Sequence, residues 1–155
     1  MKKIVLFDID YTLFDTAQFK QSGLKTYKLY EEVEEALKML SSVAEIGIFS
    51  QGEDSSQREK LRQTLIHARF KEENIHIFSL KDENLGSVLS KYKDRDIFLV
   101  DDKLEVLKLG KDLNENVYAI WLKRGPFAEV QKGIVGFTPD AIISNLSEAV
   151  AFINK

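Results

Sequence analysis

Six short apolar runs, rich in β-branched and aromatic residues, constrain the fold of this chain more than any other feature. They are Ile4–Phe7, Ile46–Phe49, Ile75–Phe78, Ile97–Val100, Val117–Leu122 and Ala141–Ile143. Most are continuous rather than alternating, which indicates strands buried on both faces of a sheet. Because helical spacing fills the segments between them, we expect an α/β fold: a three-layer, doubly wound, Rossmann-like and mostly parallel sheet of about six strands with helices on both faces.

The expected helices are marked by apolar residues that recur on one stripe. The stripes are Val33, Leu37 and Leu40; Leu61 and Leu65; Leu85, Val88, Leu89 and Tyr92; and Leu146, Ala149, Val150 and Ile153. Ser56 with Glu59 three residues later predicts a capping box, and Ser147 before Glu148 predicts the start of the last helix. The stretch from Phe14 to Lys28 has no regular pattern.

Length and composition favour one globular domain over residues 1–155, since no repeat, linker or low-complexity tract divides the chain. The absence of cysteine excludes thiol nucleophiles, thiolate metal sites and disulfides, and suits a cytoplasmic protein. A net charge of -3 offers no general attraction to nucleic acid or to an anionic membrane. The first apolar run ends at Asp8 and is too short for a signal peptide or a membrane span.

Polar residues follow four of the expected strands directly. Asp8 and Asp10 follow the first strand, Ser50-Gln51-Gly52 the second and Asp101-Asp102 the fourth, while Lys81 lies just past the third. In an open parallel sheet the ligand crevice lies beyond the carboxyl ends of the strands. We therefore expect these side chains to converge on one edge of the sheet.

The four aspartates at that edge, Asp8, Asp10, Asp101 and Asp102, would repel one another without a bound cation. The available ligands are oxygens, with no cysteine and no clustered histidine, so the ion should be hard. Magnesium is preferred where a substrate phosphate completes the ligand shell, and zinc is a poor fit.

The same residues suit phosphoryl transfer. A carboxylate is a covalent nucleophile for phosphoryl groups, and an aspartate two residues further on can protonate the leaving oxygen and then activate water. The Ser50 hydroxyl, the backbone amides that follow it and the Lys81 ammonium could hold the transferring phosphoryl oxygens. Thr12, Gln51 and Gly52 are the further expected phosphate or substrate contacts.

The segment Phe7-Asp8-Ile9-Asp10-Tyr11-Thr12-Leu13 resembles the first motif of the haloacid dehalogenase-like (HAD) phosphohydrolase superfamily, Asp-x-Asp-x-Thr/Val. Ser50 resembles the second motif, Lys81 the third and Asp101-Asp102 the fourth. The four motifs occur in the family's order and span most of the chain.

The resemblance implies a role for each matching residue. Asp8 would be the nucleophile, Asp10 the general acid and base, and Ser50 and Lys81 the phosphoryl clamps. Magnesium would bind Asp8, the backbone carbonyl of Asp10 and Asp101, with Asp102 as a ligand or an anchor. Dehalogenating relatives lack an acid at the position of Asp10, so the resemblance favours a magnesium-dependent phosphomonoester hydrolase that forms an aspartyl-phosphate.

Two features concern variation within the family. Lys81 is not followed by the proline common in relatives, and Lys91 or Lys93 could compete for its role, but Lys81 has the expected position just past the third strand. Cap domains follow the first or third strand in relatives, and neither segment is long enough here, so we expect a capless form. Its open site would serve a phosphorylated small molecule or macromolecule, or be covered by a second subunit in a homodimer.

Other residues have simpler interpretations. We expect His67 and His76 to serve in packing or at the surface. Four aromatic residues could line the site entrance, although packing under a loop is favoured; they are Phe14, Phe19, Tyr27 and Tyr30. Lys123 and Arg124 could contact a second anionic group of the substrate or form a solvated basic turn.

Three other functions remain open on sequence grounds. A receiver-like signalling module also combines a doubly wound sheet with aspartates, a lysine and magnesium, but its acceptor aspartate would follow the third strand, where Ser79-Leu80-Lys81 stands. A phosphotransferase or phosphomutase could use the same core, although such enzymes usually exclude water with a cap. An inactive binding protein would not need the full set of catalytic residues.

Overall fold

The structure, a computed structural model, describes residues 2–155 and contains a six-stranded sheet. The strands are β1 (Lys3–Phe7), β2 (Glu45–Gln51), β3 (Ile75–Phe78), β4 (Asp96–Asp101), β5 (Val117–Leu122) and β6 (Ala141–Ile143). Their order is β3-β2-β1-β4-β5-β6, and every neighbouring pair is parallel. The prediction of a doubly wound sheet is confirmed, and the sheet is entirely rather than mostly parallel.

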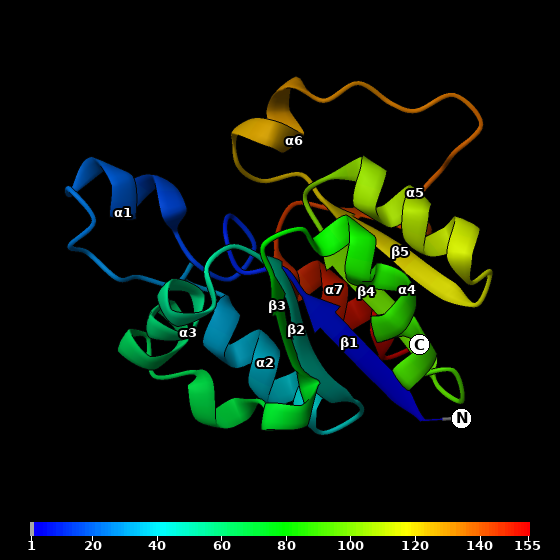
Figure 1. Cartoon of the computed structure of the whole chain (residues 1–155), viewed down its shortest axis with the longest axis horizontal. Helices are drawn as coiled ribbons and strands as arrows, with labels where there is room; N and C mark the ends of the chain where they lie inside the picture. Colours follow the sequence, from blue (N-terminus) through cyan, green and yellow to red (C-terminus); the bar gives the residue numbers. More distant parts are fainter. Residues whose placement is uncertain (1) are drawn as a thin grey trace.

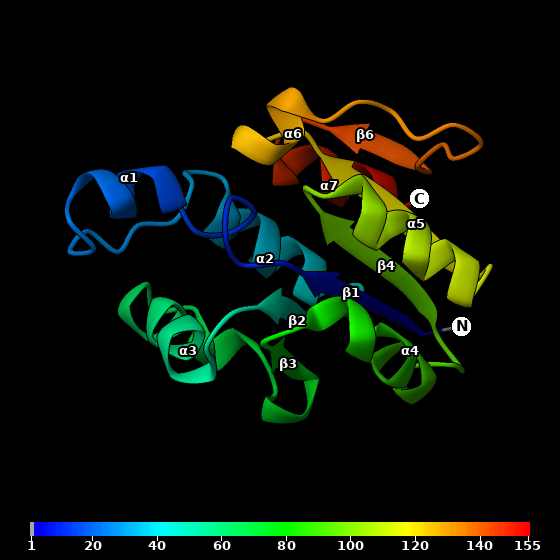
Figure 2. The ribbon, with the colours of Figure 1, turned by 45° about the horizontal axis from the view of Figure 1, so that its top comes forward.

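Helices cover both faces of this sheet (Figures 1 and 2). They are α1 (Thr16–Gln21), α2 (Val33–Ser41), α3 (Asp54–Gln63), α4 (Lys81–Lys91), α5 (Leu104–Leu113), α6 (Pro126–Val130) and α7 (Leu146–Ile153), with two short 3-10 segments at His67–Arg69 and Glu72–Asn74. The apolar sides of α2, α3 and α7 bury one face, and those of α4 and α5 bury the other. Among residues 2–155, no helix has the length and apolarity needed to cross a bilayer.

The central strand β1 shows why its apolar run is continuous. Ile4 and Leu6 belong to the core beneath α4 and α5, whereas Val5 and Phe7 belong to the core beneath α2 and α7. All four side chains are fully buried, as expected where alternate residues point to opposite, covered faces. Each such side chain contributes roughly 1.5–3 kcal/mol when buried, so a charged residue at Leu6 would disrupt the domain.

Three local predictions about helices are wrong. Ser56 lies inside α3 and does not cap it, because the helix begins before it, at Asp54. Leu65 lies beyond the end of α3 with a φ of 63° and is 83% exposed, so it does not extend the buried stripe. The last helix is capped by Asn145, which accepts a hydrogen bond from the Glu148 amide at 3.2 Å, rather than by Ser147.

The segment between β1 and α2 forms a short flap over residues 8–32, which includes α1. Backbone bridges pair Phe14 with Asp10 and with Leu29. The rings of Phe14, Phe19 and Tyr27 pack together with centroids 4.9–6.0 Å apart. The favoured prediction of aromatic packing under a loop is confirmed for these three residues, and Phe19 also lines the cavity at the sheet edge, as the alternative prediction had it.

Arg124, two residues after the end of β5, connects this flap to the sheet through several contacts. Its guanidinium lies 3.6 Å above the Tyr30 ring and 2.6 Å from a Glu32 carboxylate oxygen. It also donates to the backbone carbonyls of Tyr11 and Thr12. Both interpretations of Arg124 from the sequence are therefore wrong: it is neither a free anion-binding group nor part of a solvated turn.

Candidate active site

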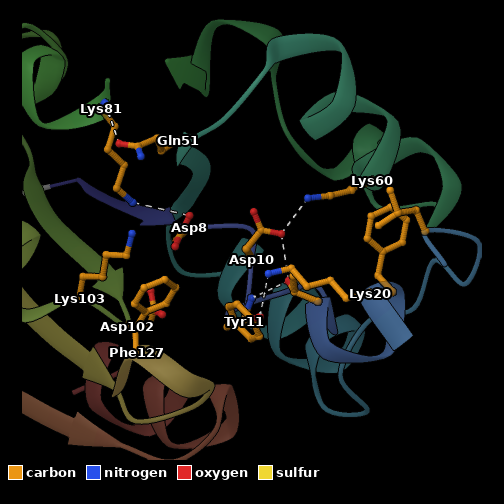
Figure 3. Close-up of a pocket in the computed structure, with 13 residues that line it drawn as sticks. Asp8, Asp10, Tyr11, Lys20, Gln51, Lys60, Lys81, Asp102, Lys103 and Phe127 are labelled. Atoms are coloured by element: carbon orange, nitrogen blue, oxygen red, sulfur yellow. Dashed lines mark hydrogen bonds and ion pairs between the residues drawn. The ribbon is translucent and has the colours of Figure 1, made fainter. Parts of the chain in front are cut away.

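The carboxyl ends of the central strands open into a cavity of about 230 Å³ (Figure 3). Five of the residues predicted for the site line it: Asp8, Asp10, Gln51, Lys81 and Asp102. They come from the ends of β1, β2 and β4 and from the first turn of α4. The cavity therefore lies where the topology of an open parallel sheet places a ligand.

Three buried carboxylates gather on one side of this cavity. Asp8, Asp101 and Asp102 each offer an oxygen atom, and these atoms lie within 4.8 Å of one another. The Lys81 ammonium is 2.6 Å from Asp101 Oδ2 and 3.6 Å from Asp8 Oδ1. Lys91 belongs to the opposite end of α4, so the geometry places Lys81 at the carboxylates.

Burial of these charges has electrostatic consequences. Burial raises the pKa of Asp8 to about 6; the Lys81 ammonium opposes this rise, and Asp101 adds to it. Burial and the neighbouring Asp101 raise the pKa of Asp102 to about 9. Burial also opposes the charge of Lys81, but Asp101 and Asp8 hold its pKa above the usual value. One ammonium does not balance the three carboxylates, and a further cation would favour their ionised forms.

Asp102 has no partner for its carboxylate among residues 2–155. As a carboxylate it has no donor, since both side-chain oxygens are buried without a partner and the residue is 1% exposed; only in its protonated form, which the raised pKa favours, does it share a hydrogen bond with Asp101. Its backbone is fixed, because Trp121 Nε1 donates to its carbonyl at 3.0 Å. A buried polar group left unsatisfied costs roughly 1–3 kcal/mol, which a hard cation would offset. The trio thus fits magnesium in donor type, charge and unmet bonding capacity.

Asp10 lies at the same sheet edge in a different environment. Thr16 Oγ1 and Lys60 Nζ contact its Oδ1 at 2.9 and 2.8 Å, and Gln57 Nε2 donates to its Oδ2 at 3.1 Å. Its carboxylate does not belong to the trio of clustered carboxylates. The part of Asp10 that the family resemblance assigns to magnesium is its backbone carbonyl, and that assignment stays a prediction.

Gln57 links Asp10 to the end of β2. Its Nε2 also donates to Ser50 Oγ at 3.0 Å and lies 3.4 Å from the Gln51 carbonyl. Gly52 makes room for it, since a Cβ on this glycine would lie 2.9 Å from the Gln57 side chain. Because the buried Ser50 hydroxyl accepts from Gln57, its own proton stays available to another acceptor. Direct substrate contacts of Ser50, Gln51 and Gly52 stay predictions.

The turn after β1 fixes the positions of its side chains. The Ile9 carbonyl accepts hydrogen bonds from the amides of Thr12, Leu13 and Phe14 at 3.0–3.2 Å. Tyr11 adopts a φ of 61°, a left-handed conformation that costs of order 1 kcal/mol for such a residue. The Thr12 side chain is fully buried and its hydroxyl lacks a partner among residues 2–155. Thr12 therefore faces the interior, and its substrate role stays a prediction.

Comparison with known proteins concerns the fold. No family model matches the chain, and no curated protein matches it in sequence. A haloacid dehalogenase-like hydrolase from Burkholderia xenovorans superposes with a TM-score of 0.80 at 18% identity, covering 97% of this chain and 95% of that one. The chain has the HAD-like hydrolase fold. Because the sequence identity is only 18%, this similarity establishes the fold alone. It confirms the fold that the four motifs predicted.

Two further solved structures show the range of proteins with the HAD-like fold. A Bacillus subtilis HAD hydrolase bound to magnesium has a TM-score of 0.72 at 13% identity, covering 99% of both chains. An L-2-haloacid dehalogenase from Xanthobacter autotrophicus with covalently bound chloropropionic acid has a TM-score of 0.69 at 10% identity, also covering 99% of both chains. The fold alone therefore does not choose between phosphate esters and haloacids.

Several residues in or behind the cavity could not be predicted from the sequence. Thr16 and Lys60 line the cavity and hold Asp10, Gln57 holds Asp10 from a buried position behind the lining, and Lys20 and Lys103 also line the cavity. Gln57 and Lys60 share one face of α3, three residues apart, but a polar face is also what solvent exposure produces. The sequence offered no signal that this face turns toward the sheet edge.

Proposed function

We propose that this protein is a magnesium-dependent phosphomonoester hydrolase that forms an aspartyl-phosphate on Asp8. The observation that carries the proposal is the buried trio of Asp8, Asp101 and Asp102 with Lys81, in which Asp102 lacks partners while Asp10 is held separately. The HAD-like fold, shared with hydrolases, supports the proposal.

Asp8 is the nucleophile in the first step. Its Oδ1 accepts the Ile9 amide at 2.8 Å and faces Lys81, which leaves Oδ2 for attack on phosphorus. The new bond joins Oδ2 to phosphorus while the bond to the leaving oxygen breaks. Asp10, in its protonated form, transfers its proton to that oxygen.

Asp10 then acts as the base in the second step. Its carboxylate removes a proton from water, the water oxygen attacks phosphorus, and the bond to Asp8 breaks to release phosphate. Thr16, Gln57 and Lys60 fix its position, and positioned proton transfer of this kind contributes typically 10²–10⁴-fold to rate.

The charge on the phosphoryl group would be offset by several residues. Asp8, Asp101 and Asp102 would hold magnesium, together with the Asp10 carbonyl that the resemblance implies. When bound, the ion supplies charge neutralisation at the phosphoryl oxygens. Lys81 adds a fixed positive charge, and the free proton of Ser50 can be donated to a phosphoryl oxygen.

Specific observations favour hydrolysis of phosphate esters over the alternatives. A haloacid dehalogenase does not need the acid and base that Asp10 provides. A receiver would carry its acceptor after β3, where Ser79 and Leu80 stand. A phosphomutase would need a cover, whereas β1 is followed only by the flap and β3 only by α4 before β4. We propose a capless cytoplasmic enzyme open to phosphorylated small molecules or macromolecules.

Steady-state assays test this function. Phosphate release from 4-nitrophenyl phosphate and chloride release from 2-chloropropionate are measured with magnesium or EDTA. We expect magnesium-dependent phosphate release that Asp8→Asn abolishes and that the surface variant Asp112→Asn retains. Chloride release without phosphate release would identify a dehalogenase. Folded wild-type protein that binds magnesium but releases neither product would overturn the proposal.

A further inference from the structure

Two aromatic rings and two lysines line the mouth of the cavity. The rings of Tyr11 and Phe127 meet edge to face, with centroids 6.4 Å apart. Lys20 Nζ lies 5.7 Å from the Tyr11 centroid, and Lys103 Nζ lies 4.6 Å from the Phe127 centroid. In the view of Figure 3, Lys103 and Phe127 lie on one side of Tyr11 and Lys20 on the other. Each ammonium group therefore has an aromatic neighbour at the mouth.

The two mouth lysines differ from the other lysines of the cavity in their partners. Lys60 forms an ion pair with Asp10 at 2.8 Å, and Lys81 forms one with Asp101 at 2.6 Å. Within residues 2–155, Lys20 and Lys103 form no ion pair, and their contacts are the aromatic rings, with the Tyr11 hydroxyl 3.4 Å from Lys20 Nζ. An aromatic ring orients an ammonium without neutralising it. Two positive charges therefore stay available to an anion.

The two rings differ in how firmly they are placed. Tyr11 keeps its left-handed φ of 61° and packs on Gly125, where a Cβ would lie 2.7 Å from the ring. Phe127, in contrast, is 49% exposed on α6 and presents apolar surface at the cavity mouth. A partly exposed aromatic residue beside unpaired cations is typical of a binding surface for a ligand with an apolar body and an anionic end.

We propose that this mouth binds a second anionic group on the substrate, with Tyr11 and Phe127 contacting the apolar part that joins it to the scissile phosphate. The substrate class is a phosphomonoester whose leaving group carries a carboxylate or another phosphate. The inference rests on the proposed function, because it assumes that the scissile phosphoryl group binds at Asp8. Since Arg124 is engaged by Glu32, the second anion is assigned to Lys20 and Lys103 instead.

A matched substrate pair tests the inference. 4-Carboxyphenyl phosphate and 4-carbamoylphenyl phosphate have nearly the same shape and differ in charge. We expect kcat/KM to favour the carboxylate about fivefold, as for a partly exposed ion pair, and the preference to fall as salt is raised. Lys20→Met and Lys103→Met should each reduce the ratio, and the double variant should bring it to about one. Lys123→Met is the control. Lys123 is exposed and does not line the cavity, which leaves the solvated turn as its role, and its ammonium also lies over a ring, 4.8 Å from the Trp121 centroid.

Binding measurements separate this inference from the hydrolase proposal. The affinities of 4-carboxybenzylphosphonate and 4-carbamoylbenzylphosphonate are measured by calorimetry with magnesium, which requires no turnover. Selective binding of the carboxylate that the double variant loses would support the mouth site even if neither ester were hydrolysed. Equal binding of the two phosphonates, binding of neither, or a preference that survives in the double variant would overturn it.

Discussion

Asp10 and Asp102 lie at the same edge of one sheet and line the same cavity, yet the fold treats them in opposite ways. Three side chains contact the Asp10 carboxylate, which is 29% exposed. The Asp102 carboxylate is buried and has no hydrogen bond among residues 2–155. Under the proposed function, donors surround the carboxylate that transfers protons and are absent around the carboxylate that would bind a cation.

The pKa of Asp102 reflects its burial and its lack of donors. Burial and Asp101 raise the pKa of Asp102 to about 9, so the folded protein strongly disfavours its charge without a cation. Buried polar groups without partners are rare in folded proteins, and a group with such a shifted pKa in a cavity is a candidate functional residue. We call Asp10 with Thr16, Gln57 and Lys60 the positioned half of the site, and Asp8, Asp101 and Asp102 with Lys81 the proposed cation-binding half; variants of each half show whether the two act separately.

After the complete loss expected for Asp8→Asn, the largest effect is that of Asp10→Asn. We expect kcat to fall about 100-fold or more, because the amide cannot transfer a proton in either step. Magnesium affinity should stay as in wild type, since the Asp10 side chain lies outside the carboxylate trio. Kinetics combined with calorimetric titration of magnesium would check both. A parallel loss of affinity and kcat would show that the two halves are one unit.

Asp102→Asn should have the opposite pattern. We expect magnesium to bind roughly 10–100-fold more weakly and to raise the melting temperature less, because an unpartnered carboxylate has been removed from the ion's surroundings. Thermal unfolding across a magnesium series measures this, with Asp112→Asn as the surface control. Undiminished magnesium binding would mean that Asp102 lacks partners for some other reason.

The pH dependence of stability sharpens the comparison. Because the pKa of Asp102 is raised to about 9, the folded protein keeps a proton that the unfolded chain has released. In EDTA the free energy of unfolding should therefore fall between pH 7 and 9, by at most about 1.4 kcal/mol per pH unit for one proton. His76 titrates outside this pH window. Burial and the nearby Lys91 lower its pKa to about 4, so its protonation makes the free energy of unfolding rise with pH under acidic conditions.

Urea unfolding at several pH values, with and without magnesium, measures that slope. Magnesium should flatten it, because the ion keeps the carboxylates deprotonated in the folded state, and its binding at pH 7 should release protons. Asp102→Asn should flatten the slope in EDTA as well. Stability that rises from pH 7 to 9 in EDTA would contradict the electrostatic account of the trio.

The carboxylate trio with Lys81, the half of the site that we propose binds a cation, could be placed from the sequence in large part. Asp8 directly follows β1, Asp101 is the last residue of β4, and Lys81 begins the helix after β3. The topology of a parallel sheet brings such positions to one edge whatever the details of helix packing. The order of strands and polar residues along the sequence was therefore sufficient to predict that Asp8, Lys81 and Asp101 lie close together.

The positioned half depends on tertiary packing, and the sequence did not reveal it. Gln57 and Lys60 reach Asp10 because of the way α3 lies across the end of β2, which the polar spacing of α3 does not encode. Local spacing also failed at Leu65. Its spacing from Leu61 predicted a buried helical residue, but α3 ends at Gln63 and Leu65 is exposed. Arg124 was misjudged because its partners, Tyr30 and Glu32, are distant in sequence.

The smallest expected effect is that of Lys60→Met, which removes one of the three groups that hold Asp10. Lys60 also lies over the rings of Phe14 and Phe19, at 5.3 and 5.5 Å, and methionine preserves much of that packing. We expect kcat to fall roughly three- to tenfold, less than in Asp10→Asn, because Thr16 and Gln57 still fix the carboxylate.

The matched control for this variant is Arg62→Met on the same helix, where the side chain is half exposed and pairs only with Glu59 among the described ion pairs. Steady-state kinetics on 4-nitrophenyl phosphate compare the two, and magnesium titration confirms that the trio is intact in both. A loss of kcat in Lys60→Met with unchanged magnesium affinity would place Lys60 in the positioned half. If kcat matched that of Arg62→Met, the Thr16 and Gln57 donors would suffice, and the charge of Lys60 would have no part in holding Asp10.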